Sequence, residues 1–231
     1  TYKGYNPQMS VIYSKVFSEL ISEHKDIWSL YTEHSFLEQL ANGSLPNAQF
    51  LKYLKQDYIF LIHFSRAWAL ATAKSDSLDE MVITSSIMHS LINEEMALHI
   101  RICEREGINI KDLKSTVETP ENIAYTRYVL EAGYSGDFLD LLISLSPCVL
   151  GYGQIGLRLK NMFTSQKYKE WIDTYSSPEY QNVCFKVGKL IDEAVSSRIG
   201  NDYHKIGKWK ILNQYFRKAT LLEIEFWEMG L

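Results

Sequence analysis

Residues 141–159 read LLISLSPCVLGYGQIGLRL, and this stretch decides the fold. Apolar residues recur along it in alternating steps of four and three, which is the spacing of one face of an α-helix. One reactive residue, Cys148, stands in this row where an apolar residue is expected. The sequence therefore predicts a long helix with a thiol on its core-facing side. The row runs Leu141, Leu145, Cys148, Tyr152, Ile155 and Leu159.

Two further helical rows have a carboxylate in the same kind of position, Asp57 in one and Glu223 in the other. A buried carboxylate is costly unless it is paired or hydrogen-bonded. We therefore expect Asp57, Cys148 and Glu223 to share one pocket, where they can act as an anchor, a nucleophile and a general acid/base. The rows run Phe50, Leu54, Asp57, Leu61, Phe64, Trp68 and Leu212, Phe216, Ala219, Glu223, Phe226, Gly230.

Helical periodicity runs nearly from end to end, and no convincing alternating strand is found. The chain has 231 residues and 46% hydrophobic content, which is enough for one substantial core. We predict an all-α fold, a single-domain helical bundle over residues 1–231 with eight to ten helices. The first helix is expected over about 7–33. Another is expected over about 77–106, opened by a capping box of Ser77 and Glu80.

Composition and charge exclude several classes of protein. The formal net charge of −4 disfavours a non-specific nucleic-acid binder. The three cysteines have no CxxC spacing, which favours a reduced, cytoplasmic compartment and no zinc site. No run of eighteen apolar residues and no signal peptide is present, so no membrane association is expected.

Each candidate reactive residue has an aromatic ring about one helical turn further on. Phe60 follows Asp57, Tyr152 follows Cys148 and Phe226 follows Glu223. This layout suits a planar substrate held between rings, although aromatic residues are frequent here at 13%. Pro147 lies directly before the cysteine and predicts a kink. The kink either serves packing or aims the thiol into a cavity, and the sequence leaves both open.

Several blocks resemble the TenA/thiaminase II family, in the family's order over about residues 9–231. They are Gln56-Asp57-Tyr58 after Gly43-Ser44-Leu45-Pro46, the stretch His89 to His99 with Asn93-Glu94-Glu95, Ser146-Pro147-Cys148 with Gly151-Tyr152, Tyr168 to Tyr175, and Glu223-Ile224-Glu225-Phe226-Trp227. The resemblance implies a haem oxygenase-like fold that needs no haem or other cofactor. It also implies a homotetramer that hydrolyses 4-amino-5-aminomethyl-2-methylpyrimidine, and thiamin, to the hydroxymethylpyrimidine in thiamin salvage.

The resemblance also implies roles for single residues. Cys148 resembles the nucleophile, Glu223 the acid/base and Asp57 the carboxylate that holds the amino edge of the pyrimidine. Four residues match ring-binding positions: Tyr125, Tyr152, Tyr175 and Phe226. Phe60 departs from the family, which commonly has tyrosine there, so a contact from that hydroxyl is in doubt.

Two other functions remain open at this stage. A non-catalytic pyrimidine-binding domain would keep Asp57 and the tyrosines but would not need Cys148. A di-iron oxidase on the same fold would need histidines and carboxylates, but His89 and His99 do not share a helix face. Fungal relatives fuse such a domain behind pyrimidine-kinase domains. The chain begins at Thr1 without a methionine, so a fusion to kinase domains is one expectation for it.

Overall fold

The structure is a computed structural model that describes residues 11–231. In this range it contains α-helices, one π-helical segment and one short 3-10 helix, with no strand. The α-helices are α1 Lys15–Glu23, α2 Lys25–Thr32, α3 Ser35–Asn42, α4 Asn47–Ala73, α5 Leu78–Ser90, α6 Met96–Arg105, α7 Ile110–Lys114, α8 Pro120–Ser135, α9 Phe138–Met162, α10 Lys169–Ser176, α11 Pro178–Ile199 and α12 Gly207–Met229. The π segment is Leu91–Glu95, and the 3-10 helix is Tyr203–Lys205.

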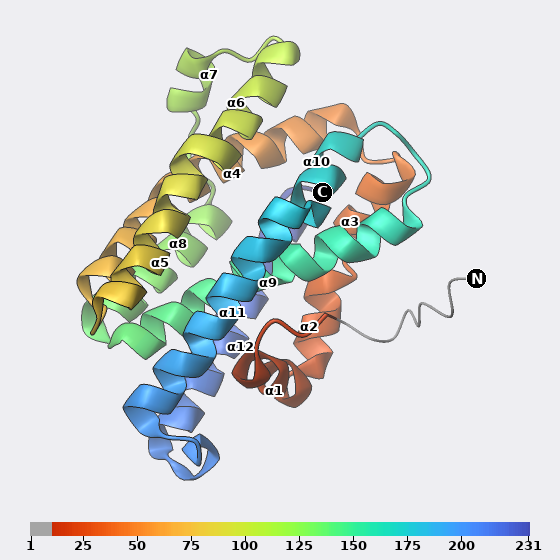
Figure 1. Cartoon of the computed structure of the whole chain (residues 1–231). Coiled ribbons are helices and arrows are strands. Elements are labelled where there is room, and N and C mark those ends of the chain that lie inside the picture. The colour runs from red at the N-terminus through yellow and green to blue at the C-terminus, as the bar shows by residue number, and fades with distance from the viewer. Residues whose placement is uncertain (1–10) are drawn as a thin grey trace.

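Helix α9 lies at the centre of the bundle, and the other long helices pack around it (Figure 1). Helices α4, α8, α10, α11 and α12 all contact it. This order explains its sequence, because a helix covered on all sides is apolar around its whole circumference. The three helices that carry the predicted reactive residues, α4, α9 and α12, therefore all border one core.

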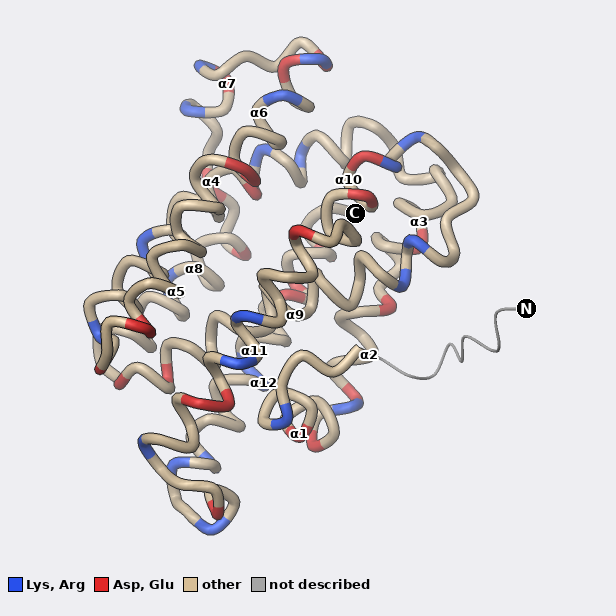
Figure 2. Tube along the Cα trace, viewed as in Figure 1, with Lys and Arg blue, Asp and Glu red and all other residues tan. Residues whose placement is uncertain are grey.

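Helix α9 is long and apolar enough to cross a membrane, by length and composition alone. However, 89% of its most apolar 18-residue window is buried inside the bundle. Its apolar surface is therefore covered by neighbouring helices. Figure 2 shows the complementary pattern, in which charged residues are scattered along the outer helices and α9 carries few. Positive and negative charges are interspersed in this view rather than gathered on one face.

The prediction of one continuous first helix over about 7–33 is wrong, because two helices occupy this stretch. Two helices, α1 and α2, meet at His24, whose backbone leaves helical geometry at φ −127° and ψ 36°. The His24 ring lies 2.8 Å from the Asn213 side chain and packs beside Phe216. The break thus lets both short helices follow the surface of the bundle. The predicted start near residue 7 lies outside the described residues.

The expected helix over 77–106 is interrupted by the π segment, in which the Met96 N–H donates to the Leu91 carbonyl five residues back. Ser77 caps the helix as predicted, but Glu80 accepts from the Asp76 N–H, so the capping box is only half formed. The count of eight to ten helices was too low, since the described residues form twelve α-helices. The all-α bundle itself is confirmed.

Candidate active site

Two hydroxyl groups bond to backbone carbonyls next to the proline of the helix that carries Cys148. Pro147 has no N–H, so the carbonyl of Ile143 loses its partner in the helix. The Ser146 hydroxyl donates to that carbonyl at 2.7 Å, and the Tyr31 hydroxyl donates to the carbonyl of Pro147 at 3.0 Å. The residue after the proline, Cys148, is half-buried. The carbonyl that the proline leaves free therefore has a partner, and the turn before Cys148 is tied to α2 through Tyr31.

Asp57 on α4 is paired with a histidine from α6. Oδ2 of Asp57 lies 2.5 Å from Nε2 of His99, and both side chains are buried. Nδ1 of His99 donates to the carbonyl of Glu95 at 2.7 Å, so the ring donates at both nitrogens only when it is an imidazolium. Burial disfavours that charge, but the Asp57 carboxylate outweighs it, and the pKa of His99 is raised. The pair therefore holds Asp57 as an oriented carboxylate.

Glu223 on α12 is buried beside Tyr125 of α8, whose hydroxyl donates to Oε1 of Glu223 at 2.5 Å. Burial raises the pKa of Glu223 to about 8, although the Tyr125 hydrogen bond opposes this shift and the charge of Asp57 supports it. A carboxyl with this pKa is mostly protonated at neutral pH. Glu223 is therefore suited to donate a proton.

The thiol of Cys148 is buried among carboxyl groups. Burial raises the pKa of Cys148 well above its usual value, and the charges of Glu223, Glu95 and Asp57 act in the same direction. The thiol is thus protonated at rest and needs a proton acceptor when it reacts. Charges on the two carboxyl groups predicted from the helical rows, Asp57 and Glu223, thus both raise the pKa of this thiol.

Aromatic rings close this region from two sides. Phe60 packs 5.2 Å from Tyr125 and 5.3 Å from Phe226. Tyr152 packs edge-on against Tyr175, with ring centroids 4.9 Å apart. The structure therefore brings all five predicted ring residues and all three reactive residues into one buried cluster around α4, α8, α9, α10 and α12.

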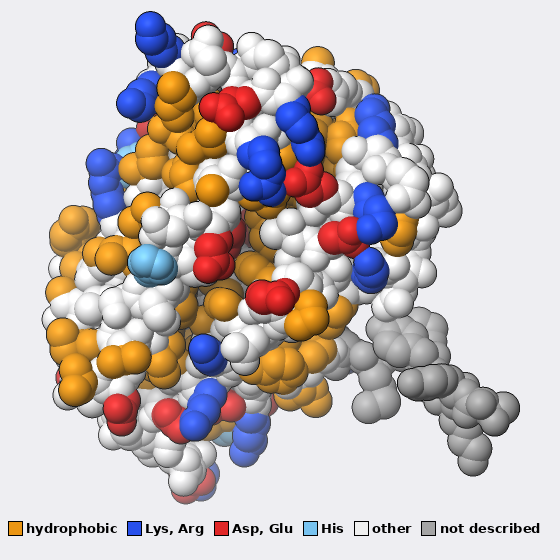
Figure 3. Space-filling view, turned by 45° about the horizontal axis from the view of Figure 1, so that its top comes forward, with side chains coloured by type: hydrophobic (Ala, Val, Ile, Leu, Met, Phe, Trp, Pro, Cys, Tyr) orange, Lys and Arg blue, Asp and Glu red, His pale blue; other side chains and the backbone are white. Residues whose placement is uncertain are grey.

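A pocket of about 220 Å³ borders the cluster between the Leu91–Glu95 π segment with its flanking helices and helices α10 and α11. Glu95 and Val149, the neighbour of Cys148, form part of its wall. Figure 3 shows a hollow on this face, with hydrophobic side chains inside it and charged side chains at its edge. Asp57, Cys148 and Glu223 do not line the pocket. The buried cluster lies behind its wall.

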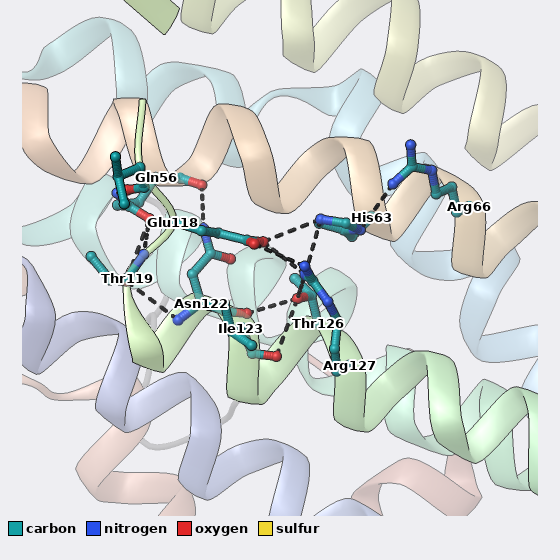
Figure 4. A network of polar contacts seen from close by, with 10 residues as sticks. Gln56, His63, Arg66, Glu118, Thr119, Asn122, Ile123, Thr126 and Arg127 are labelled. Atoms are coloured by element: carbon teal, nitrogen blue, oxygen red, sulfur yellow. Dashed lines mark hydrogen bonds and ion pairs between the residues drawn. The ribbon is translucent and has the colours of Figure 1, made fainter. Parts of the chain in front are cut away.

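A polar network fixes α4 against α8 next to Asp57 (Figure 4). The Gln56 side chain donates to the carbonyl of Val117 at 2.9 Å and accepts from the backbone N–H of Thr119 at 3.1 Å. Asn122 donates to both the carbonyl and the side chain of Gln56. Because Gln56 precedes Asp57, and Asn122 lies one turn before Tyr125, this network sets the position of α4 relative to α8 at the site.

Sequence reasoning missed three residues that touch the predicted ones. Tyr53 shares a hydrogen bond of 2.8 Å with the Tyr152 hydroxyl, and Tyr31 contacts the proline carbonyl as described above. The third is His99, which pairs with Asp57 from α6. The sequence signal that could have identified His99 is its position four residues after Glu95 in the His89–His99 block.

No group of three histidine, cysteine or acidic side chains that could hold a metal ion occurs within residues 11–231. The arrangement instead combines a thiol, two buried carboxyl groups and a set of aromatic rings. It can hold a flat heterocycle and move protons to and from it.

The profile of one protein family, described as the TENA/THI-4/PQQC family, matches residues 21–231. The chain belongs to this family. Among curated relatives, the aminopyrimidine aminohydrolase of Halalkalibacterium halodurans is 31% identical over 216 residues, which are 92% of this chain and 94% of the relative. The resemblance to the TenA/thiaminase II family that was read from the sequence blocks is confirmed.

A fungal relative has a longer chain. The putative hydroxymethylpyrimidine/phosphomethylpyrimidine kinase 2 of Schizosaccharomyces pombe is 34% identical over 221 residues, which are 92% of this chain but only 38% of the relative. A family domain therefore also occurs as part of a larger kinase-named protein.

Solved structures agree with the fold. The crystal structure of a TenA family transcription regulator from Silicibacter sp. TM1040 is 52% identical, with a TM-score of 0.93 over 95% of this chain and 97% of that chain. A domain of unknown function with a heme oxygenase-like fold from Shewanella denitrificans is 12% identical, with a TM-score of 0.69 over 93% of this chain and 91% of that chain. The haem oxygenase-like class of the predicted fold is confirmed.

Proposed function

We propose that the protein is an aminopyrimidine aminohydrolase of the thiaminase II type. It hydrolyses 4-amino-5-aminomethyl-2-methylpyrimidine, and thiamin, to 4-amino-5-hydroxymethyl-2-methylpyrimidine in thiamin salvage. The single observation that carries this proposal is the convergence of Asp57, Cys148 and Glu223 in one aromatic-walled cluster. The name of the Halalkalibacterium halodurans relative supports it.

In this mechanism, Asp57 binds the amino edge of the pyrimidine. Its Oδ2 is occupied by His99, while no other hydrogen bond to its side chain occurs within residues 11–231. Oδ1 is thus available to accept from an amino group by a charge-assisted hydrogen bond. The rings of Phe60, Tyr125, Tyr152, Tyr175 and Phe226 enclose the heterocycle.

Glu223 then protonates a ring nitrogen and makes the ring electrophilic. Its pKa of about 8 keeps the proton available at neutral pH. The Cys148 thiolate attacks a ring carbon and forms a C–S bond, which dearomatises the ring. Ammonia or the thiazole leaves from the exocyclic methylene, and water adds there. Expulsion of the sulfur restores aromaticity and returns the proton to Glu223.

The remaining features of the proposal concern assembly and location. We propose a homotetramer in the cytoplasm, acting on small pyrimidines without a cofactor, a nucleic-acid partner or a membrane. Charges of both signs mixed along the outer helices, with a net charge of −4, disfavour a nucleic-acid partner, although one structural relative carries a regulator's name. Fusion to kinase domains stays a prediction, to which the Schizosaccharomyces pombe relative gives a precedent.

A pyrimidine-binding domain without activity is the second candidate. It would use the Asp57–His99 pair and the rings, which orient a ligand without reacting with it. The Cys148 thiol favours the enzyme, because a binding domain has no need of a nucleophile buried among carboxyl groups.

Product analysis after incubation with each of the two substrates distinguishes these candidates. The proposal expects release of hydroxymethylpyrimidine from at least one of them, and loss of that release in Glu223→Gln. Binding of the pyrimidine without any product would instead identify a binding domain.

A further inference from the structure

The proposed mechanism requires a proton acceptor that it has not yet assigned. The Cys148 thiol is protonated at rest, so its proton must leave as the C–S bond forms. Glu223 cannot receive it, because this carboxyl must itself be protonated to donate to the ring. Asp57 is held by His99 and faces the amino edge of the ring. A further base must therefore lie nearby.

Glu95 occupies the place that such a base requires. It is the last residue of the π segment, and π segments inside α-helices often occur at functional sites. Its Oε2 lies 3.4 Å from the Tyr175 hydroxyl, and its carbonyl receives the ring N–H of His99. The charge of Glu95 raises the pKa of the Cys148 thiol, as the charges of Glu223 and Asp57 do.

Glu95 also connects the buried cluster with solvent. Its side chain is partly exposed and forms part of the wall of the 220 Å³ pocket, together with Val149, the residue that follows Cys148. A proton taken from the thiol therefore has a path outward. Asp57, Cys148 and Glu223 do not line this pocket.

We propose that Glu95 is the second acid–base group of the site, which carries protons between the Cys148 thiol, the leaving nitrogen and the attacking water. This inference rests on the proposed function and adds a catalytic residue to it.

The proton transfers balance for the aminomethyl substrate. The thiol proton passes to the Glu95 carboxylate while sulfur bonds to the ring carbon and Glu223 protonates the ring nitrogen. Glu95 gives this proton to the exocyclic amine, the C–N bond breaks, and ammonia leaves. Water then bonds to the methylene carbon and gives a proton to Glu95. When the C–S bond breaks, Glu95 returns this proton to the sulfur, and the ring nitrogen returns its own to Glu223.

Thiamin makes a different demand on the same residue. Its leaving group departs as a neutral thiazole and needs no proton. The thiol proton passes to Glu95 and leaves through the pocket to solvent, which accounts for the one proton released per turnover. Water at the methylene carbon then gives a proton to Glu95, which returns it to the sulfur when the C–S bond breaks. The amine substrate needs Glu95 for one step more, the protonation of the leaving nitrogen, so loss of Glu95 should shift the preference towards thiamin.

The test compares Glu95→Gln with wild type on both substrates, followed by release of hydroxymethylpyrimidine. We expect turnover of the aminomethyl substrate to fall by about 100-fold or more, and the loss on thiamin to be about tenfold smaller. The matched control is Glu179→Gln, an exposed glutamate on α11 that lines the same pocket. It should leave both rates unchanged.

Glu95→Asp keeps the carboxylate and serves if Glu95→Gln does not fold. It should be slower than wild type but keep the wild-type ratio between the two substrates. Equal losses on both substrates in Glu95→Gln, or a loss below about tenfold on the amine, would overturn the inference. If wild type itself hydrolyses neither substrate, the proposed function fails, and this is seen before any variant is made.

Discussion

Replacing Glu223 by glutamine should make the protein more stable at neutral pH while it abolishes turnover. The side chain is 2% exposed, and burial raises its pKa from 4.5 to about 8. The folded protein therefore retains a proton between pH 4.5 and 8 that the unfolded chain releases. Stability contributed by this group is largest at low pH and is lost as pH rises through this range.

The magnitude follows from the shift. At pH 7 the buried acid costs the fold about 3 kcal/mol, since a tenfold change in an equilibrium corresponds to about 1.4 kcal/mol. Glutamine avoids this cost, and its carbonyl oxygen can still accept from Tyr125. Its buried NH2 group lacks a partner, which costs about 1 kcal/mol. The net gain in unfolding free energy is about 2 kcal/mol at pH 7 and near zero at pH 5.

Urea unfolding of wild type and Glu223→Gln at pH 5 and pH 7 measures both quantities. Glu225→Gln is the matched control, because Glu225 lies on the same helix but is exposed, and its effect should not depend on pH. A Glu223→Gln protein that is less stable than wild type at pH 7, or an equal difference at both pH values, would refute the reasoning.

Three further predictions follow from the packing and charges. Gly156→Ala should lower the unfolding free energy by about 1–3 kcal/mol, because the new Cβ would lie 2.5 Å from the backbone of α10. The control is Gly207→Ala, where the added methyl group meets nothing within 4 Å. Equal melting temperatures of the two variants would contradict the prediction. His99→Leu should cost about 3–5 kcal/mol in urea unfolding, because the Asp57 carboxylate stays buried without its partner. Adding Asp57→Asn should recover part of that loss, and strictly additive effects would argue against the pair. Turnover of the aminomethyl substrate should rise with pH through about 7, where the base Glu95 ionises, and fall through about 8, where the acid Glu223 loses its proton. A flat pH profile across this range excludes the assigned roles.

The groups that set this pH dependence come from several elements. Burial raises the pKa of Glu95 to about 7, the His99 charge on α6 opposes the shift, and Asp57 on α4 supports it. The Tyr175 hydroxyl on α10 lowers the pKa, and Glu94 beside it in the π segment raises it. Substitutions at these neighbours should therefore move the rising limb of the profile.

The reactive residues were predictable because each interrupts an otherwise apolar helical row. Periodicity of this kind is written locally, so Asp57, Cys148 and Glu223 could be found from residues within a few turns. The burial of Glu223 was predictable for the same reason, since its row faces the core. The unpartnered Ile143 carbonyl follows from the missing N–H of Pro147, although the Ser146 and Tyr31 hydroxyls that bond near it do not.

The remaining features depend on contacts between distant residues. His99 lies 42 positions from Asp57, and nothing in either row indicates that they meet. The Leu91–Glu95 π segment adds a residue to one turn, which shifts every later side chain around the helix axis and removes Glu95 from any regular row. The break at His24 depends on α12, which lies at the other end of the chain.

The most direct test of the account is the rate of hydroxymethylpyrimidine release by Cys148→Ser. Cys184→Ser is its matched control, because the Cys184 thiol is buried on α11 and contacts the Val149 carbonyl, next to the reactive residue. The account predicts that wild type and Cys184→Ser hydrolyse the aminomethyl pyrimidine while folded Cys148→Ser releases no product. Near-normal hydrolysis by Cys148→Ser would contradict the covalent mechanism.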